Sequence, residues 1–153
     1  MKEFDYDLNY KELDFTDEET RQLYRIGRGE QGVLLVRPYT NDICAHWRFK
    51  TPEIAVKSSN KIYSMYLDYR DNKDFIGMDM CRKFLEMGFT RSRRYANHRT
   101  GKKYDDEGNV RPQEPDHATC HFAKSATIFK HVRDIVAKSD EYVSMRKQWR
   151  SNE

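Results

Sequence analysis

The chain has 153 residues, of which 37% are hydrophobic and 35% charged, a composition typical of one folded domain with a densely ionic surface. Its 13% aromatic content exceeds that of disordered chains, and no apolar run approaches the roughly 20 residues that cross a bilayer. The three scattered cysteines and the lack of an apolar leader exclude a disulfide scaffold, and we expect a cytoplasmic protein with reduced thiols.

The net charge of +3 is unevenly distributed along the sequence. Residues 1–20 contain two Lys and eight Asp or Glu, which gives −6. Residues 82–103 contain eight Lys or Arg and only Glu86 as an acid, which gives +7. Because a block of one sign focuses electrostatic potential, the second segment favours a polyanionic partner.

The first third of the chain is predicted to be irregular. Residues 1–16 alternate acidic and aromatic side chains and are expected to form an arm packed on the body. Residues 17–50 are predicted to contain a short helix, a glycine-rich loop over 27–32 and a small β-hairpin. The hairpin is expected to pair the apolar run 33–36 with residues 44–50.

Residues 51–150 are predicted to be helical. Thr51 is expected to cap a helix over 52–70, and Asp74 a second helix that ends at Gly88. We expect a short third helix to Asn97, a turn-rich loop over 98–115, a long helix from Asp116 and a last helix after Ser139. The predicted class is therefore α+β: a mainly helical single domain over 1–153 with a small N-terminal β-hairpin.

The glycine-rich loop matches G-x-G-x-x-G from Gly27 to Gly32. A dinucleotide-binding loop would need a strand before it and a helix after it, the reverse of the predicted order. A kinase is excluded because the chain has no His-Arg-Asp catalytic loop. Two interpretations remain: backbone N–H groups near Gly29, helped by Arg28, hold an anion, or the glycines only form a tight turn.

Residues 82–103, the basic segment, interleave cations with aromatic residues. This mixture is typical of surfaces that bind phosphates through the cations and stack bases on the rings. Our leading hypothesis is a small binding module for a phosphate-rich ligand, with nucleic acid favoured. Buried core aromatics, or a solvated face neutralised by the acidic arm, would produce the same pattern. The candidate ligand-binding residues are Arg91, Arg93, Arg94, Tyr95, Arg99, Lys102 and Lys103, with Arg28 and Gly29 from the glycine loop.

Two other functions stay open. A small enzyme acting on a phosphorylated metabolite or nucleotide could use His98 as its base beside Asn97, although these two residues could simply end a helix. A protein–protein adaptor could use residues 5–14 as an acidic arm. His117 and His121 would share a helix face, but we interpret it as a polar surface and predict neither metal nor cofactor.

Four segments resemble domain-of-unknown-function family number forty-three eighty-five, which occurs in bacteria, fungi and large bacterial viruses. They are Arg25–Leu34, His46–Glu53, Gly77–Met80 and Gly88–His98. The resemblance spans nearly the whole chain and implies one stand-alone domain, such as a virus-encoded accessory protein. It implies no activity and assigns no functional residues.

Overall fold

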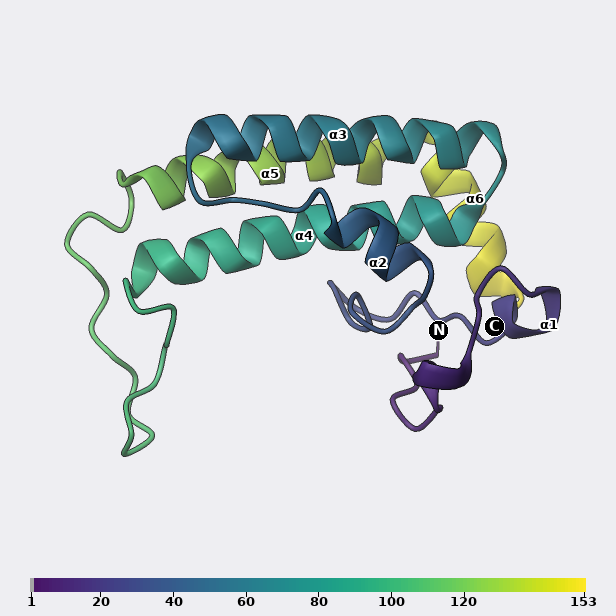
Figure 1. The fold of residues 1–153 in the computed structure, drawn as a ribbon, viewed down its shortest axis with the longest axis horizontal. Coiled ribbons are helices and arrows are strands. Elements are labelled where there is room, and N and C mark those ends of the chain that lie inside the picture. The colour runs from purple at the N-terminus through teal and green to yellow at the C-terminus, as the bar shows by residue number, and fades with distance from the viewer. Residues whose placement is uncertain (1) are drawn as a thin grey trace.

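The computed structural model describes residues 2–153 and is built almost entirely from helices (Figure 1). Three long helices, α3, α4 and α5, lie side by side, and α6 turns back across one end of them. The helices are α1 (Glu18–Arg21), α2 (Tyr39–Cys44), α3 (Pro52–Asp71), α4 (Phe75–Asn97), α5 (His121–Lys138) and α6 (Asp140–Ser151), with a 3-10 turn η1 at Tyr10–Glu12.

The central helix is α4, whose N-terminal half is buried nearly all round. Its side chains Phe84 and Leu85 are fully buried, as is Phe129 of α5. Gly88 lets the two helices approach, because a Cβ added there would lie 2.4 Å from the Phe129 ring. This close packing holds α4 firmly in the centre of the bundle.

Two predicted helix starts are confirmed. Thr51 accepts a hydrogen bond from the Ile54 backbone N–H (3.2 Å), and Pro52 occupies the first turn of α3. Asp74 accepts one from the Gly77 N–H (3.2 Å) at the start of α4.

The predicted β-hairpin, and with it the α+β class, is wrong. Residues 33–36 form turns, α2 follows at Tyr39–Cys44, and 46–50 are irregular. Among residues 2–153 the one β-type pairing is an isolated bridge between Tyr104 and Val110 in the long loop. The protein is a mainly α-helical single domain.

Side chains replace the missing strand pairing. Ser58 of α3 donates a hydrogen bond to the His46 carbonyl (2.7 Å) and accepts one from the Arg48 N–H (3.0 Å). Thr40 likewise donates to the Val33 carbonyl (2.8 Å) and accepts from the Val36 N–H (3.0 Å). Periodicity alone cannot identify the conformation of a short buried apolar run, which is why residues 33–36 were wrongly predicted to form a strand.

Two helix boundaries also differ from expectation. Gly88 does not end a helix, since α4 continues to Asn97 and absorbs the predicted third helix. The helix predicted from Asp116 begins only at His121, after a turn. None of the helices within residues 2–153 combines the length and apolar character that a bilayer crossing needs.

The N-terminal third packs over the bundle as an irregular layer. Phe4, Tyr10 and Phe15 of the arm are buried, as expected for a packed segment; Met1 lies outside the described residues. The last helix holds this layer in place, because Trp149 donates to the Tyr24 carbonyl (3.1 Å).

Candidate functional site

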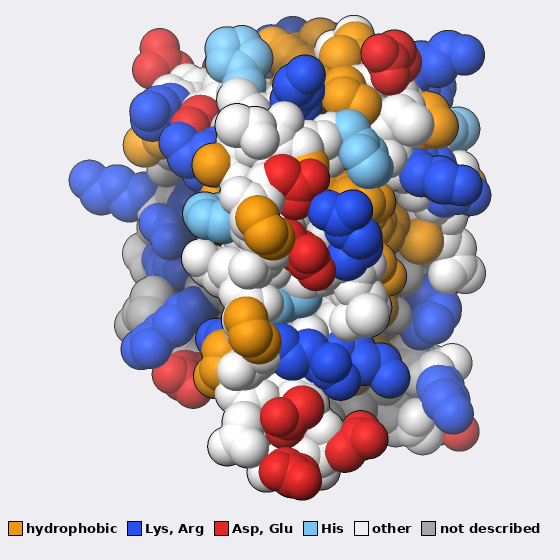
Figure 2. Space-filling model, turned by 90° about the vertical axis from the view of Figure 1, so that its left-hand side faces the viewer, with side chains coloured by type: hydrophobic (Ala, Val, Ile, Leu, Met, Phe, Trp, Pro, Cys, Tyr) orange, Lys and Arg blue, Asp and Glu red, His pale blue; other side chains and the backbone are white. Residues whose placement is uncertain are grey.

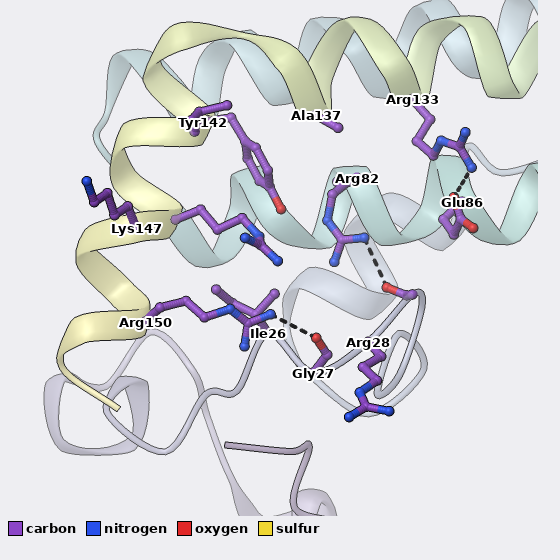
Figure 3. Close-up of a pocket in the computed structure, with 13 residues that line it drawn as sticks. Ile26, Gly27, Arg28, Arg82, Glu86, Arg133, Ala137, Tyr142, Lys147 and Arg150 are labelled. Atoms are coloured by element: carbon purple, nitrogen blue, oxygen red, sulfur yellow. Dashed lines mark hydrogen bonds and ion pairs between the residues drawn. The ribbon is translucent and has the colours of Figure 1, made fainter. Parts of the chain in front are cut away.

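Two hollows flank α4. The first, the basic cavity, has a volume of about 780 Å³ and lies between the glycine loop, α4, α5 and α6 (Figure 3). It is lined by six cationic side chains and one acidic one. The lining consists of Ile26, Gly27, Arg28, Gly29, Arg82, Glu86, Arg133, Ala137, Tyr142, Val143, Arg146, Lys147 and Arg150.

A buried carboxylate, Asp79, does not line the basic cavity itself but binds two of its lining residues, Arg82 and Tyr142, and we call it the cavity floor. Asp79 accepts hydrogen bonds from Arg82 Nε (2.8 Å), Tyr142 OH (2.6 Å) and Tyr24 OH, and Lys83 Nζ lies 3.8 Å away. Asp79 and Lys83 are both fully buried. Arg82 is thus the arginine that pairs with Asp79.

The neighbouring charges and hydrogen bonds determine the ionisation state of the Asp79 carboxyl group. Burial acts to raise the pKa of Asp79, but the charges of Arg82 and Lys83 and the hydrogen bonds from Arg82 and Tyr142 outweigh it and hold the pKa at about 2. Burial also lowers the pKa of Lys83, although Asp79 opposes that shift. Asp79 is therefore a permanent anion at neutral pH, and it anchors Arg82.

The glycine loop presents carbonyl groups to the cavity and holds its arginines. Arg82 Nη1 donates to the Gly29 carbonyl (3.0 Å), and Arg150 Nη2 donates to the Gly27 carbonyl (3.0 Å), as Figure 3 shows. Arg28 lies on the rim, where its guanidinium is 3.4 Å from the exposed Glu3 carboxylate. Arg28 and Gly29 thus stand at one cavity, and an anion-binding role for them stays a prediction.

The second hollow, the aromatic groove, has a volume of about 590 Å³ and lies near the C-terminal end of α4. It is lined by Cys44, Trp47, Arg48, Phe49, Lys50, Ile54, Tyr95 and Phe122. Tyr95 and Glu86, which lines the basic cavity, are nine residues apart. Because an α-helix has 3.6 residues per turn, the two hollows face opposite sides of α4.

Four half-buried rings form a continuous cluster in the aromatic groove. The ring centroids of Phe49 and Tyr95 are 5.7 Å apart, those of Tyr95 and Phe122 5.4 Å, and those of Trp47 and Phe49 5.2 Å. The indole of Trp47 is fixed by a hydrogen bond to the Phe84 carbonyl (3.0 Å). These contacts hold the rings in defined positions while leaving part of each face open.

The predicted basic residues are dispersed. The Arg91 guanidinium lies 5.9 Å from the Trp47 ring centroid, beside the groove, and Arg94 is exposed. Arg93 donates to Asn97 Oδ1 (2.6 Å). Arg99 pairs with Asp116 (2.9 Å).

The rest of the basic segment lies in the long loop. Lys102 and Lys103 are exposed, and Lys103 Nζ lies 5.6 Å from the Tyr104 ring centroid. Figure 2 views the end of the molecule that carries this loop and shows Lys and Arg mixed with Asp, Glu and hydrophobic side chains.

The candidate catalytic pair lies away from both hollows. His98 is buried, and its Nδ1 has no hydrogen-bond partner within residues 2–153. Asn97 is half-buried and is occupied by Arg93. Neither residue lines the basic cavity or the aromatic groove, so neither hollow brings them together with the glycine loop, and their catalytic role stays a prediction.

Candidate metal ligands do not cluster. Within residues 2–153 no group of three or more His, Cys, Asp or Glu side chains could hold a metal ion. His117 sits in the turn before α5 and His121 begins that helix, so they do not share a helix face as expected. Cys44, Cys81 and Cys120 are free thiols.

Several cavity and groove residues escaped the sequence interpretation. Arg146 and Arg150 are one helical turn apart on α6 and, with Lys147, form a cationic face that spacing alone could have revealed. Arg133 contributes from α5 and pairs with Glu86. Trp47 and Phe49 were expected on a strand, and no local signal joins them to Phe122.

Comparison with known proteins places the chain in a family. The family model described as "Domain of unknown function (DUF4385)" matches residues 5–152. The chain belongs to this family. The match confirms the resemblance read from the sequence motifs and covers nearly all of the domain. No curated protein and no solved structure matches the chain.

Proposed function

We propose that this DUF4385 domain binds single-stranded nucleic acid in the aromatic groove. One observation carries the proposal: four half-buried rings line one groove together with two cations and no carboxylate. Proteins that bind single strands combine these two features, stacking bases on rings while cations follow the phosphates.

The rings supply surfaces that bases can cover. Tyr95, Phe49 and Phe122 contact one another at tilted angles, so their exposed faces point in different directions along the groove. Each stacked base contributes about 1–3 kcal/mol, largely independent of its identity. We therefore expect binding with weak sequence preference.

The cations supply the phosphate contacts. Arg48 and Lys50 are exposed at the groove, and within residues 2–153 neither has a carboxylate within 4.0 Å. Arg91 lies against the outer ring, Trp47. The charge of an unpaired cation is not offset by a nearby carboxylate, so it attracts an incoming phosphate more strongly. Arg99 is a weaker candidate because it is already paired with Asp116.

The other two hypotheses have less support. For the enzyme alternative, neither the basic cavity nor the aromatic groove is lined by His98 or Asn97. The adaptor alternative uses the acidic arm, but the aromatic side chains Phe4, Tyr10 and Phe15 of this arm are buried in the core and therefore cannot contact a partner protein. The enzyme and adaptor hypotheses both stay untested predictions, and the structure supports them less than it supports nucleic-acid binding in the aromatic groove.

Fluorescence anisotropy with a labelled single-stranded oligonucleotide of about 12 nucleotides tests the proposal. Lys50→Glu and Tyr95→Leu should each weaken binding at least about tenfold, because one reverses a phosphate contact and the other removes a stacking face. The logarithm of the affinity should fall with that of the salt concentration, with a slope of about −0.7 for each phosphate contact.

Matched controls separate the groove from general charge effects. Lys61→Glu changes an exposed lysine on α3, and Tyr104→Leu changes an exposed tyrosine in the long loop; neither residue lines the groove. Both should bind like the parent protein. If the controls weaken binding as much as the groove variants, or if affinity is independent of salt, the proposal is wrong.

A further inference from the structure

We infer that the basic cavity is a second, separate binding site, for a compact phosphorylated compound. It goes beyond the nucleic-acid proposal, because it concerns the opposite side of α4 and a different class of ligand. The inference rests on the surplus of positive charge, on the rigid placement of two arginines, and on the shape and chemistry of the lining.

Of the six cations in the lining, four are paired with carboxylates and two, Arg146 and Lys147, supply the surplus charge; the pairs are Arg28 with Glu3, Arg82 with Asp79, Arg133 with Glu86 and Arg150 with Glu153. Glu86 is paired with Arg133, and Asp79 below is surrounded by Arg82 and Lys83. Arg146 and Lys147 have no carboxylate within 4.0 Å among residues 2–153. Concentrating like charges in a concave space is unfavourable for the empty protein, and an anion relieves that repulsion.

Two of the arginines are held before any ligand arrives. Arg82 is fixed through Nε by Asp79 and through Nη1 by the Gly29 carbonyl, and only 12% of its side chain is exposed. Arg150 is fixed by the Gly27 carbonyl and lies 3.6 Å from the Glu153 carboxylate. Figure 3 shows their guanidinium groups reaching toward the same space from α4 and α6. Arginines already ordered lose little entropy on binding.

The ligand class follows from the groups that line the space. Guanidinium groups match the tetrahedral oxygens of phosphate and can bind it through two hydrogen bonds at once. Ile26, Ala137 and Val143 add an apolar wall, which suits a small organic body attached to the phosphate. About 780 Å³ is within the range of small-molecule sites.

The same lining disfavours a nucleic-acid strand. Tyr142 is the one aromatic residue of the lining, and it is buried with its hydroxyl on Asp79. No ring face is therefore open for a base to stack on, in contrast to the aromatic groove. A ligand here would be recognised through phosphate contacts rather than through base stacking.

Isothermal titration calorimetry with pyrophosphate, at constant ionic strength and without divalent metal, tests the inference. The parent protein should show saturable binding at one site. Arg146 lines the cavity from α6 and Arg28 from the glycine loop. Arg146→Glu and Arg28→Glu should each weaken pyrophosphate binding at least about tenfold, because a carboxylate repels the anion that the guanidinium attracts. Arg146 is exposed and its side chain makes no hydrogen bond within residues 2–153, so its replacement should leave thermal unfolding almost unchanged.

The controls separate this site from the aromatic groove. Lys61→Glu makes the same change of charge away from both hollows and should bind pyrophosphate like the parent. Tyr95→Leu should also retain pyrophosphate binding, whatever its effect on oligonucleotides. The inference is overturned by the absence of saturable binding or by an equal loss in Lys61→Glu. It is also overturned if Arg146→Glu weakens oligonucleotide binding alone.

Discussion

The basic cavity and the aromatic groove lie on opposite sides of α4 and hold their cations in different ways. In the cavity, Arg82 and Arg150 are tied to backbone carbonyls, and Arg82 also to a buried carboxylate. In the groove, Arg48 and Lys50 are exposed, and aromatic rings provide most of the surface. One helix thus supports a hollow whose arginines are anchored and an apolar one whose cations are exposed.

This difference has an energetic consequence. Charges fixed around Asp79 belong to the folding core, so changing them should alter stability as well as binding. Charges at the edge of the groove contribute little to the fold, because exposed cations interact weakly through water. The three predictions below test this contrast, from the cavity floor to the edge of the groove.

The largest effect is expected for Asp79→Asn. The substitution leaves Arg82 and Lys83 without their shared carboxylate, and removing one partner of a buried ion pair costs about 3–5 kcal/mol. Urea denaturation measures the loss in the free energy of unfolding. Asp68→Asn, at an exposed carboxylate on α3, should stay within about 0.5 kcal/mol of the parent. Equal losses would contradict the contrast.

The acid sensitivity of the protein should depend on the same carboxylate. The pKa of Asp79 is about 2 in the folded state and 3.8 as its ordinary value, so ionised Asp79 stabilises the fold above about pH 4. That stabilisation, about 2 kcal/mol, is lost as the pH falls from about 4 to 2. Thermal unfolding temperatures measured across this range should decline less steeply for Asp79→Asn; a parallel decline would argue against an ionised floor.

The smallest effect is expected beside the aromatic groove. Thr51→Ala removes the side-chain hydrogen bond to the Ile54 N–H at the start of α3, and loss of such a cap costs about 1 kcal/mol. Ser64→Ala, an exposed position on the same helix, is the matched control and should be nearly neutral. A loss as large as that of Asp79→Asn would mean that the groove region is as integral to the core as the cavity floor.

The helices were largely predictable and the irregular third was not. Thr51 and Asp74 mark helix starts by local chemistry, which the sequence displays directly. The turns around Val33 depend on the hydroxyl group of Thr40, and the segment after α2 depends on that of Ser58; the packed fold alone sets these partners. Glycine is common at helix ends, but Gly88 lies within α4, where its lack of a side chain leaves space for the Phe129 ring of α5.

The candidate sites were predictable only in their residue types. The basic segment contains Arg91 and Tyr95, which lie at the aromatic groove, and also Arg99, which an acid of the long loop neutralises. The basic cavity draws Arg28, Arg82 and Arg146 from three distant segments. No local pattern joins such residues, because their proximity is produced by helix packing.

The link between the glycine loop and the last helix bears on how the protein is made. Tyr24 and Gly27 offer their carbonyls to Trp149 and Arg150, partners separated from them by 125 and 123 residues. A ribosome adds about 5–20 residues per second, so the first segment to emerge waits many seconds for the last one. During translation the nascent amino-terminal layer therefore lacks these two anchors until α6 has left the exit tunnel.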